Sequence, residues 1–183
     1  YPSVLAYDPA YAYELAVIIK DGLRRMLEEG ESITYYLTIM NEFYKMPEMP
    51  EGCEEGILKG MYRFRPSTNR RAKAKAHLFG SGAILNEVVK AQEVLENTYG
   101  IAADVWSVTS YKNLYVDATD AQRWNILNPD RDERVPYVSQ LLQGEQGVFI
   151  AASDYMKVLP EILAKWIPCP STGLGTQRLR RTD

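Results

Sequence analysis

Apolar residues in the first forty positions follow two different spacings. Residues 3–7 and 33–40 are short apolar runs, each of a length typical of a buried strand. Between them, over residues 11–26, apolar side chains recur every three or four positions, as on one face of a helix. We expect Asp8 to cap this helix and Pro9 to occupy its first position. Strand, helix and strand in this order predict a βαβ unit with two parallel strands.

A break in the chain follows this unit. Pro47 and Pro50 interrupt any regular element, and the glutamate-rich stretch after them predicts a short helix over residues 51–59. Gly60 suits the end of that helix, because glycine readily adopts the left-handed conformation found there.

A domain boundary is expected near Gly60. Residues 61–65 predict a strand, and residues 63–75 carry six Lys or Arg side chains with no acidic residue among them. We interpret this basic segment as a hairpin-like connection, either solvated or used to steer an anionic partner. Residues 1–60 are therefore expected to complete one domain, and residues 61–183 to form a second.

The second half alternates between strand-like and helix-like stretches. Strands are predicted over residues 74–79, 103–109 and 147–152, and helices over 83–99, 135–143 and from Ser153 or Asp154 to Trp166, while residues 111–127 are expected to be irregular at first and then helical. This alternation predicts an α/β fold with a mostly parallel open sheet and helices on both faces.

Composition is that of an ordinary globular protein. The chain has 183 residues, of which 46% are apolar and 25% charged, and its net charge of −3 gives no reason to expect nucleic acid or an anionic membrane as a partner. The two cysteines, Cys53 and Cys169, lack zinc-like spacing and are expected to be reduced thiols of a cytoplasmic protein. No apolar run approaches the roughly 20 residues of a membrane span. Tyr1 in place of an initiator methionine favours a fragment.

Two short segments are candidate sites. Gly80, Ser81 and Gly82 connect a predicted strand to a helix, where free N–H groups can bind a small anion. The alternative is a tight turn, since Leu85 interrupts any G-x-G-x-x-G pattern.

The second candidate leaves the carboxyl end of a predicted parallel strand, which is where ligands of open α/β sheets bind. It contains Asn41, Glu42 and Tyr44, and we expect an active-site rim or a loop that packs two domains together.

Two residue types carry no catalytic expectation. His77 is the only histidine, which excludes a multi-histidine metal site, and we expect a structural, hydrogen-bonded side chain. Six of the thirteen tyrosines fall in the first quarter of the chain, a clustering that suits a protein interface better than a catalytic set: Tyr7, Tyr11, Tyr13, Tyr35, Tyr36 and Tyr44.

One thirty-residue block is specific enough to resemble a known family. Residues 35–64 read YYLTIMNEFYKMPEMPEGCEEGILKGMYRF, and this block resembles the homodimeric pyruvate dehydrogenase E1 component, a thiamine-diphosphate enzyme of the transketolase-like superfamily. The resemblance continues along the chain through Tyr7-Asp8-Pro9, Gly80-Ser81-Gly82, Asp104-Val105-Trp106-Ser107, Arg123-Trp124-Asn125, Val135-Pro136-Tyr137 and Ser153-Asp154-Tyr155-Met156.

The resemblance implies a role within a larger enzyme. Residues 1–60 would end the central pyrimidine-binding domain, and residues 61–183 would form most of a three-layer α/β/α transketolase C-terminal domain. The family decarboxylates pyruvate and acetylates the lipoyl group of its E2 acetyltransferase partner, as a homodimer in the bacterial cytoplasm. Thiamine diphosphate and Mg²⁺ would bind outside this segment, because the Gly-Asp-Gly signature is absent. The resemblance therefore implies no catalytic, cofactor or metal residue on this chain, which alone would be inactive.

Alternatives remain open at this point. The chain could be a free-standing α/β module that binds a small anion at Gly80, Ser81 and Gly82, or a superfamily member that acts on another 2-keto substrate. Residues 177–181 depart from the family pattern by replacing a glycine-containing acidic turn with an arginine-rich stretch. The family also continues beyond this point, so the second domain is expected to be incomplete.

Overall fold

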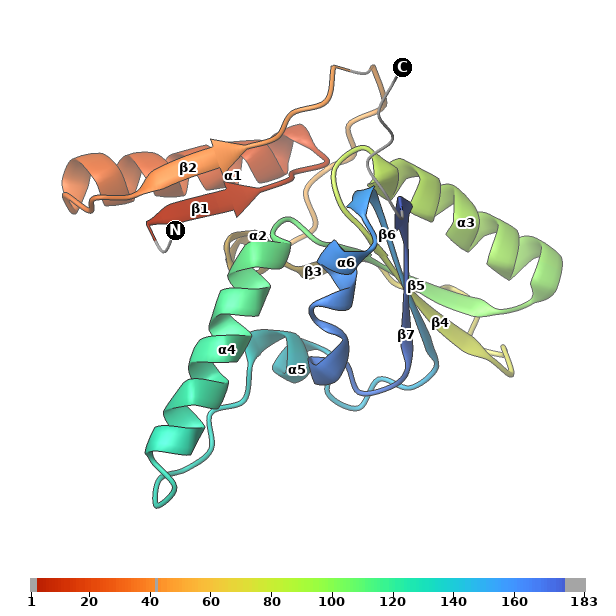
Figure 1. Ribbon diagram of the computed structural model, residues 1–183. Coiled ribbons are helices and arrows are strands. Elements are labelled where there is room, and N and C mark those ends of the chain that lie inside the picture. Colours follow the sequence, from red (N-terminus) through yellow and green to blue (C-terminus); the bar gives the residue numbers. More distant parts are fainter. Residues whose placement is uncertain (1–2, 42, 177–183) are drawn as a thin grey trace, which may run out of the picture.

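The computed structural model describes residues 3–41 and 43–176, and it begins with the predicted βαβ unit. Strand β1 (Val4–Tyr7) leads into helix α1 (Ala12–Leu23), a π-helical turn η1 (Arg24–Glu28) follows, and strand β2 (Thr34–Leu37) returns. The two strands pair in parallel, with Val4 opposite Thr34 (Figure 1). The prediction of this unit is confirmed. Its strand β2, however, keeps Tyr36 60% exposed and is not covered on both faces.

The predicted start of helix α1 is wrong. Asp8 does not cap the helix, because its carboxylate accepts a hydrogen bond from the hydroxyl of Thr38 at 2.7 Å. The helix begins only at Ala12, after a bend at Ala10 and Tyr11, so Pro9 lies before the first helical turn. The carboxylate of Glu14 instead accepts the N–H groups of Ala10 and Tyr11, which satisfies donors at the helix start.

A five-stranded sheet forms the body of the second part. Its strands are β3 (Tyr62–Arg65), β4 (Lys75–Gly80), β5 (Ala102–Ser107), β6 (Val148–Met156) and β7 (Ser171–Thr176), in the order β3-β5-β4-β6-β7. Every pairing is parallel except that of β3 with β5, which is antiparallel. The predicted fold class, an α/β fold with a mostly parallel sheet, is confirmed.

Helices cover both faces of this sheet (Figure 1). Their bounds are α2 (Glu54–Lys59), α3 (Ile84–Tyr99), α4 (Tyr111–Leu127), α5 (Tyr137–Leu141), α6 (Val158–Glu161) and a 3₁₀ turn η2 (Ala164–Trp166). Leu78 and Val105 pack with α3 on one face, whereas Phe79 and Trp106 pack with the α4 and α5 side chains on the other. This alternation follows from the two-residue period of a strand. Ser110 caps α4, so the expected irregular start at residue 111 is wrong.

The basic segment does not form the expected hairpin. Strands β3 and β4 both pair with β5, from opposite sides, so residues 66–74 pass across the end of β5 instead of joining two neighbours. The backbone N–H of Ser67 donates to the carboxylate of Asp104 on β5 at 2.7 Å. This bond holds the crossing segment to the strand that it crosses.

The end of β6 corrects another prediction. Ser153 and Asp154 do not cap a helix, because β6 runs on to Met156, which pairs with Thr176 of β7. Strand β7 was not predicted, since it contains two glycines and only one large apolar residue. The backbone of β6 passes close to Gly175: a Cβ atom there would lie 2.5 Å from the carbonyl oxygen of Tyr155, so the position requires glycine.

Candidate functional site at the strand ends

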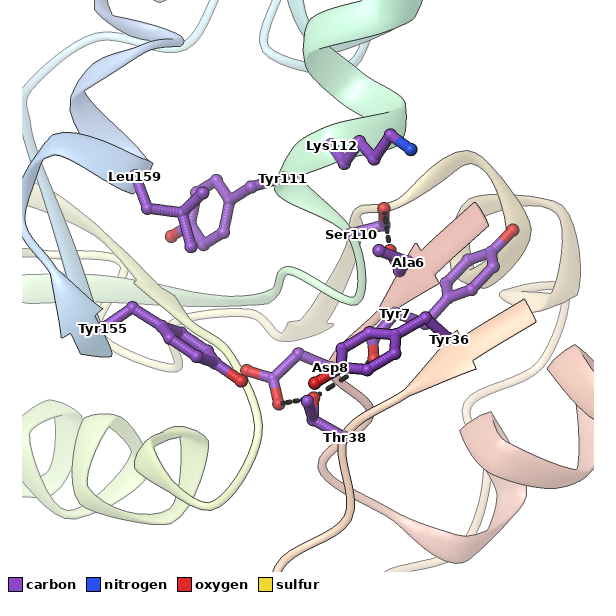
Figure 2. A pocket seen from close by; sticks show the side chains of 10 residues that line it. All are labelled: Ala6, Tyr7, Asp8, Tyr36, Thr38, Ser110, Tyr111, Lys112, Tyr155 and Leu159. Atoms are coloured by element: carbon purple, nitrogen blue, oxygen red, sulfur yellow. Dashed lines mark hydrogen bonds between the residues drawn. The ribbon is translucent and has the colours of Figure 1, made fainter. Parts of the chain in front are cut away.

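A pocket of about 170 Å³ opens where the parallel strands of the two sheets end (Figure 2). Asp8 follows β1, Thr38 follows β2, Tyr111 lies just after β5, and Tyr155 is near the end of β6. Ligands of open α/β sheets bind at the carboxyl ends of strands and at seams between domains. The topology therefore gathers these side chains where a ligand site is expected.

Asp8 is the charged group of this pocket. The Thr38 hydroxyl donates to Oδ1 of Asp8 at 2.7 Å, and the N–H of Gly82 donates to the Asp8 carbonyl oxygen at 3.1 Å. A Cβ atom at position 82 would lie 2.9 Å from the Asp8 carboxylate, and Gly82 has a φ of +51°, so only glycine fits this turn. Burial raises the pKa of the Asp8 carboxyl, and the hydrogen bond from Thr38 opposes that shift.

The predicted anion turn therefore faces a carboxylate of the same chain. Ser81 is buried and Gly82 touches Asp8, so a second anion near the turn would be repelled. Gly80 is the last residue of β4 and packs against Leu85, which requires its lack of a side chain. Anion binding by Gly80, Ser81 and Gly82 stays a prediction.

Tyrosines supply much of the pocket wall. Tyr111 is only 5% exposed, and its hydroxyl has no hydrogen-bond partner among the described residues. Burial raises its pKa, so the phenol stays neutral. Tyr155 and Tyr36 are 41% and 60% exposed and border the opening, while the buried Tyr7 bonds to the Leu58 carbonyl oxygen.

The expectation of an external tyrosine interface needs correction. Tyr7 and Tyr11 are at most 4% exposed and lie in the chain's own core. The hydroxyl of Tyr13 lies 2.6 Å from that of Tyr62, which belongs to the second part of the chain. These rings fill an internal seam because they combine a large apolar body with one polar atom.

Asn41 and Tyr44 of the second candidate segment do not line this pocket. Asn41 is exposed, and Glu42 is outside the described residues. The hydroxyl of Tyr44 donates to the Ala10 carbonyl oxygen at 2.5 Å, and its ring meets Tyr11 edge-on at 6.3 Å between centroids. A role for Asn41, Glu42 and Tyr44 as an active-site rim or domain interface stays a prediction.

Glu14 is a buried acid that the sequence analysis did not single out. Its side chain is fully buried, and it accepts hydrogen bonds from the hydroxyls of Tyr62 and Ser107 at 2.7 and 2.6 Å besides the two N–H groups at the helix start. These donors come from both parts of the chain. A glutamate three residues into a helix is a readable capping signal, but its long-range partners are not.

His77 is buried and hydrogen-bonded, as expected of a structural histidine. The indole N–H of Trp106 donates to Nδ1 at 3.3 Å, so the imidazole proton lies on Nε2, which is 3.2 Å from the Gln146 carbonyl oxygen. The ring also stacks on Phe149 with 4.5 Å between centroids. Burial lowers the pKa of His77 and keeps it neutral.

Asp104 and Glu145 surround His77, and the three groups could suggest a metal site because their ligand atoms lie within 4.8 Å of one another. Lys75 already occupies the space between the two carboxylates: its ammonium is 2.9 Å from Asp104 and 2.7 Å from Glu145. Arg63 adds a second cation over the ring of Trp106. The negative charges are therefore balanced by the chain itself, and we assign no metal here.

Comparison with protein families decides the classification. Residues 60–178 match the transketolase-like C-terminal domain, and residues 1–47 match the middle domain of the pyruvate dehydrogenase E1 component. The chain belongs to the transketolase-like C-terminal domain family. The resemblance to the pyruvate dehydrogenase E1 component is confirmed along the whole chain.

Curated relatives carry that name. The pyruvate dehydrogenase E1 components of Pseudomonas aeruginosa and Escherichia coli K12 are each 46% identical over all of this chain, and that of Mycobacterium tuberculosis is 41% identical. The chain spans about a fifth of the length of these relatives, covering 21% of the Pseudomonas protein and 20% of the other two.

Solved structures support the fold. A transketolase from Pichia stipitis superposes with a TM-score of 0.53 at 17% identity, covering 90% of this chain and 23% of that one. Identity this low shows the shared fold alone. Over the residues described, the helices are too short or too polar to cross a membrane.

The described residues do not fit a diphosphate and its Mg²⁺. The turn before α3 faces the Asp8 carboxylate, which would repel a diphosphate, and Lys75 fills the space between Asp104 and Glu145. We therefore derive no catalytic step through such a group on this chain.

Proposed function

We propose that this chain is the C-terminal part of a pyruvate dehydrogenase E1 component. One observation carries the proposal: the middle-domain match at residues 1–47 and the C-terminal-domain match at residues 60–178 occur in that order, and 46% identity to E1 components runs through the junction between them. The complete enzyme would decarboxylate pyruvate on thiamine diphosphate and acetylate the lipoyl group of an E2 acetyltransferase, in the bacterial cytoplasm.

The role of this segment in that enzyme would be structural. We propose that residues 1–60 complete the middle domain and that residues 61–183 form a C-terminal domain packed on it. The Glu14 carboxylate supports this packing of one domain on the other, because its hydrogen bonds with Tyr62 and Ser107 join the two parts. Thiamine diphosphate and Mg²⁺ would bind in the portions of the relatives that this chain does not match, which agrees with the unsuitable charge of the turn beside Asp8.

The proposed homodimer finds support in surface composition. Residues 36–46 include several large side chains that are strongly exposed in this chain, among them Ile39 at 67% and Phe43 fully exposed. Contiguous exposed apolar surface commonly marks a protein interface. This stretch is the surface that we propose to be covered by the remainder of the enzyme or by its second subunit.

The test is an assay of the complete protein that contains this segment. Purified enzyme with thiamine diphosphate and Mg²⁺ should reduce ferricyanide in the presence of pyruvate, and should acetylate a lipoyl domain with the same substrate. The 183-residue chain alone should do neither. Pyruvate turnover by the isolated chain, or a complete protein that ignores pyruvate, would contradict the proposal.

Two control reactions distinguish the proposed activity from those of related enzymes. Ketol transfer between sugar phosphates would indicate a transketolase, and turnover of a longer 2-keto acid in preference to pyruvate would indicate a different 2-keto acid dehydrogenase. A native protein of only 20.8 kDa, the mass of this chain, would indicate a free-standing module.

A further inference from the structure

The pocket at the strand ends combines a half-buried carboxylate with aromatic walls. Asp8 lies beside Tyr36 and Tyr155, Tyr111 lines the same cavity, and most of the surface facing the cavity is apolar (Figure 2). Three tyrosines and one carboxylate around a cavity can bind an ammonium group, because the faces of aromatic rings are electronegative. None of these residues is required by the function proposed above.

Within the described part of the chain, one polar group of this pocket lacks a counter-ion and another lacks a hydrogen-bond partner. Asp8 takes part in none of the ion pairs that the described residues form, and its hydrogen bond from Thr38 is with a neutral partner. The hydroxyl of Tyr111 is buried without a hydrogen-bond partner. A half-buried carboxylate without a counter-ion and a buried hydroxyl without a partner each cost free energy unless a ligand or solvent satisfies them.

The cationic side chain that lines this pocket is engaged elsewhere. Lys112 lines the rim, but its ammonium donates to the carbonyl oxygen of Val4 at the start of β1. The positive charge that would balance Asp8 must therefore come from outside these elements. Burial raises the pKa of Asp8, as expected for a carboxyl held without a counter-ion.

We propose that this pocket binds a small organic ammonium cation, with the charged nitrogen at Asp8 and its alkyl groups against the tyrosine rings. The volume of about 170 Å³ suits a ligand of the size of tetramethylammonium or choline and is too small for a nucleotide. The hydroxyl of Tyr111 is then available to a polar substituent of the ligand. The same chemistry is presented by a lysine side chain of another protein segment.

Binding would also stabilise the seam of the molecule. The walls come from residues 6–38 on one side and from residues 110–159 on the other, so an occupant contacts both parts of the chain. A ligand that binds only the folded, assembled form raises its stability in proportion to its occupancy.

The test compares a cation with its uncharged isostere on the complete protein that contains this segment. Isothermal titration calorimetry with choline should show binding, and 3,3-dimethyl-1-butanol, which has carbon in place of nitrogen, should bind about tenfold more weakly or worse. Butylammonium represents the lysine side chain. Tighter binding of choline points to a free small molecule, and tighter binding of butylammonium points to a lysine from a partner segment.

Matched variants test whether the Asp8 carboxylate is the group that binds the cation. Asp8→Asn keeps a side chain that can accept from Thr38 but removes the charge, and it should weaken choline binding by about tenfold or more. Asp130→Asn removes an exposed carboxylate in the loop after α4 that does not line the pocket, and it should change the affinity less than about twofold.

A second pair of variants, at Tyr155, tests the proposal even if Asp8→Asn fails to fold. Tyr155 is 41% exposed, so its replacement is tolerated by the fold. Tyr155→Phe should retain binding because it keeps the ring, whereas Tyr155→Leu should weaken it by about fivefold. The proposal is overturned if neither cation binds, if the neutral isostere binds as tightly as choline, or if Asp8→Asn and Tyr155→Leu both leave the affinity unchanged.

Discussion

Glu14 shows how much of this molecule depends on a single buried side chain. Its carboxylate is fully buried and accepts four hydrogen bonds, two from N–H groups at the start of α1 and two from the hydroxyls of Tyr62 and Ser107. Burial raises the pKa of the Glu14 carboxyl, and the donors that surround it oppose that shift. One residue thus both starts a helix and joins two parts of the chain.

Replacement of Glu14 should be strongly destabilising. In Glu14→Ala the two N–H groups and the two hydroxyls lose their acceptor while remaining buried, so the free energy of unfolding should fall by about 3 kcal/mol or more. Urea denaturation followed by circular dichroism measures this change. Glu28→Ala, at an exposed position of the following π-helical turn, is the matched control and should cost less than about 0.5 kcal/mol. Equal losses in the two variants would show that the Glu14 bonds are not important.

His77 should make stability depend on pH. Burial lowers its pKa in the folded chain below the ordinary value of about 6.5, so the unfolded chain binds a proton first as the pH falls. The free energy of unfolding should therefore decrease on acidification below about pH 6.5, by at most about 1.4 kcal/mol per pH unit. The charged groups facing this ring are Lys75, Arg63, Asp104 and Glu145.

A substitution separates this effect from that of the carboxylates. His77→Gln should remove the slope between about pH 6.5 and 5 while leaving the loss at lower pH. That later loss comes from Asp104 and Glu145: burial opposes their ionisation, but hydrogen bonds from Ser67 and Lys75 bring their pKa values below the ordinary range. Their contribution is present above about pH 4 and is lost as the pH falls through the lowered values. Denaturation curves from pH 3 to pH 8 test both windows, and an unchanged slope in His77→Gln would contradict the assignment.

Among the secondary-structure elements, helix α4 is attached to the rest of the molecule by its first residues. The hydroxyl of Ser110 accepts the N–H of Asn113 at 3.0 Å and donates to the carbonyl oxygen of Ala6 on β1 at 2.6 Å. The same hydroxyl therefore caps the helix and fixes it to the first sheet. The expected irregular start of this segment was wrong. It was inferred from the weak apolar periodicity of residues 111–127, and the capping role of Ser110 was not considered.

Ser110→Ala should lower the free energy of unfolding by about 1–2 kcal/mol, because it removes a cap and leaves a carbonyl group of β1 with one partner fewer. The comparison is Thr119→Ala, in which the lost hydroxyl bonds only to carbonyl groups of the same helix. Thermal unfolding of both variants measures the difference. If Ser110→Ala were no more harmful than Thr119→Ala, the bond to Ala6 would contribute nothing.

Strand β7 could not be inferred from its own composition. Its residues Ser171–Thr176 include Gly173 and Gly175, which local rules read as a turn. In the structure the carbonyl oxygens of Lys157 and Tyr155 lie 3.0 and 2.5 Å from where a Cβ atom would sit at these glycines. The glycines are there because another part of the backbone approaches closely, and no local pattern reports that approach.

At the scale of the whole molecule, the stretch of residues 36–46 is the surface that most needs a partner. Ile39 is 67% exposed here and Phe43 is fully exposed, beside the half-exposed Met40 and Met46. If the proposed E1 assembly is correct, this stretch is buried in the complete protein. Analytical ultracentrifugation of the complete protein then tests whether this apolar stretch contributes to the dimer interface.

Ile39→Asp should weaken self-association or the packing of the complete enzyme, raising the dimer dissociation constant by about tenfold or more, because it places a charge in an apolar contact. Ile126→Asp is a matched control: Ile126 lies near the end of α4 with 71% of its surface exposed. It should leave assembly unchanged. Equal behaviour of the two variants would remove the support that this surface gives to the proposed dimer.

Most of the fold could be predicted, whereas the pocket could not. The βαβ unit, the helix that ends at Gly60, and strands β4 and β5 follow from periodicity and from glycine at helix ends, which are properties of neighbouring residues. The candidate turn at Gly80, Ser81 and Gly82 was located correctly as a turn, but its main neighbour, the Asp8 carboxylate, lies more than seventy residues earlier in the chain. Because Asp8 was expected to cap a helix, its contact with this turn was not predicted.

The sequence by itself determined the family, the class of fold and the order of nearly all elements, because ordered motifs and apolar spacing are local and survive at 46% identity. Only the tertiary structure decided where Asp8, Glu14 and Tyr111 point and what they meet. The physical reason is that burial and charge balance depend on groups brought together from distant positions by sheet order and strand crossing. A carboxylate at the end of one strand becomes a cation site only when the ends of other strands surround it.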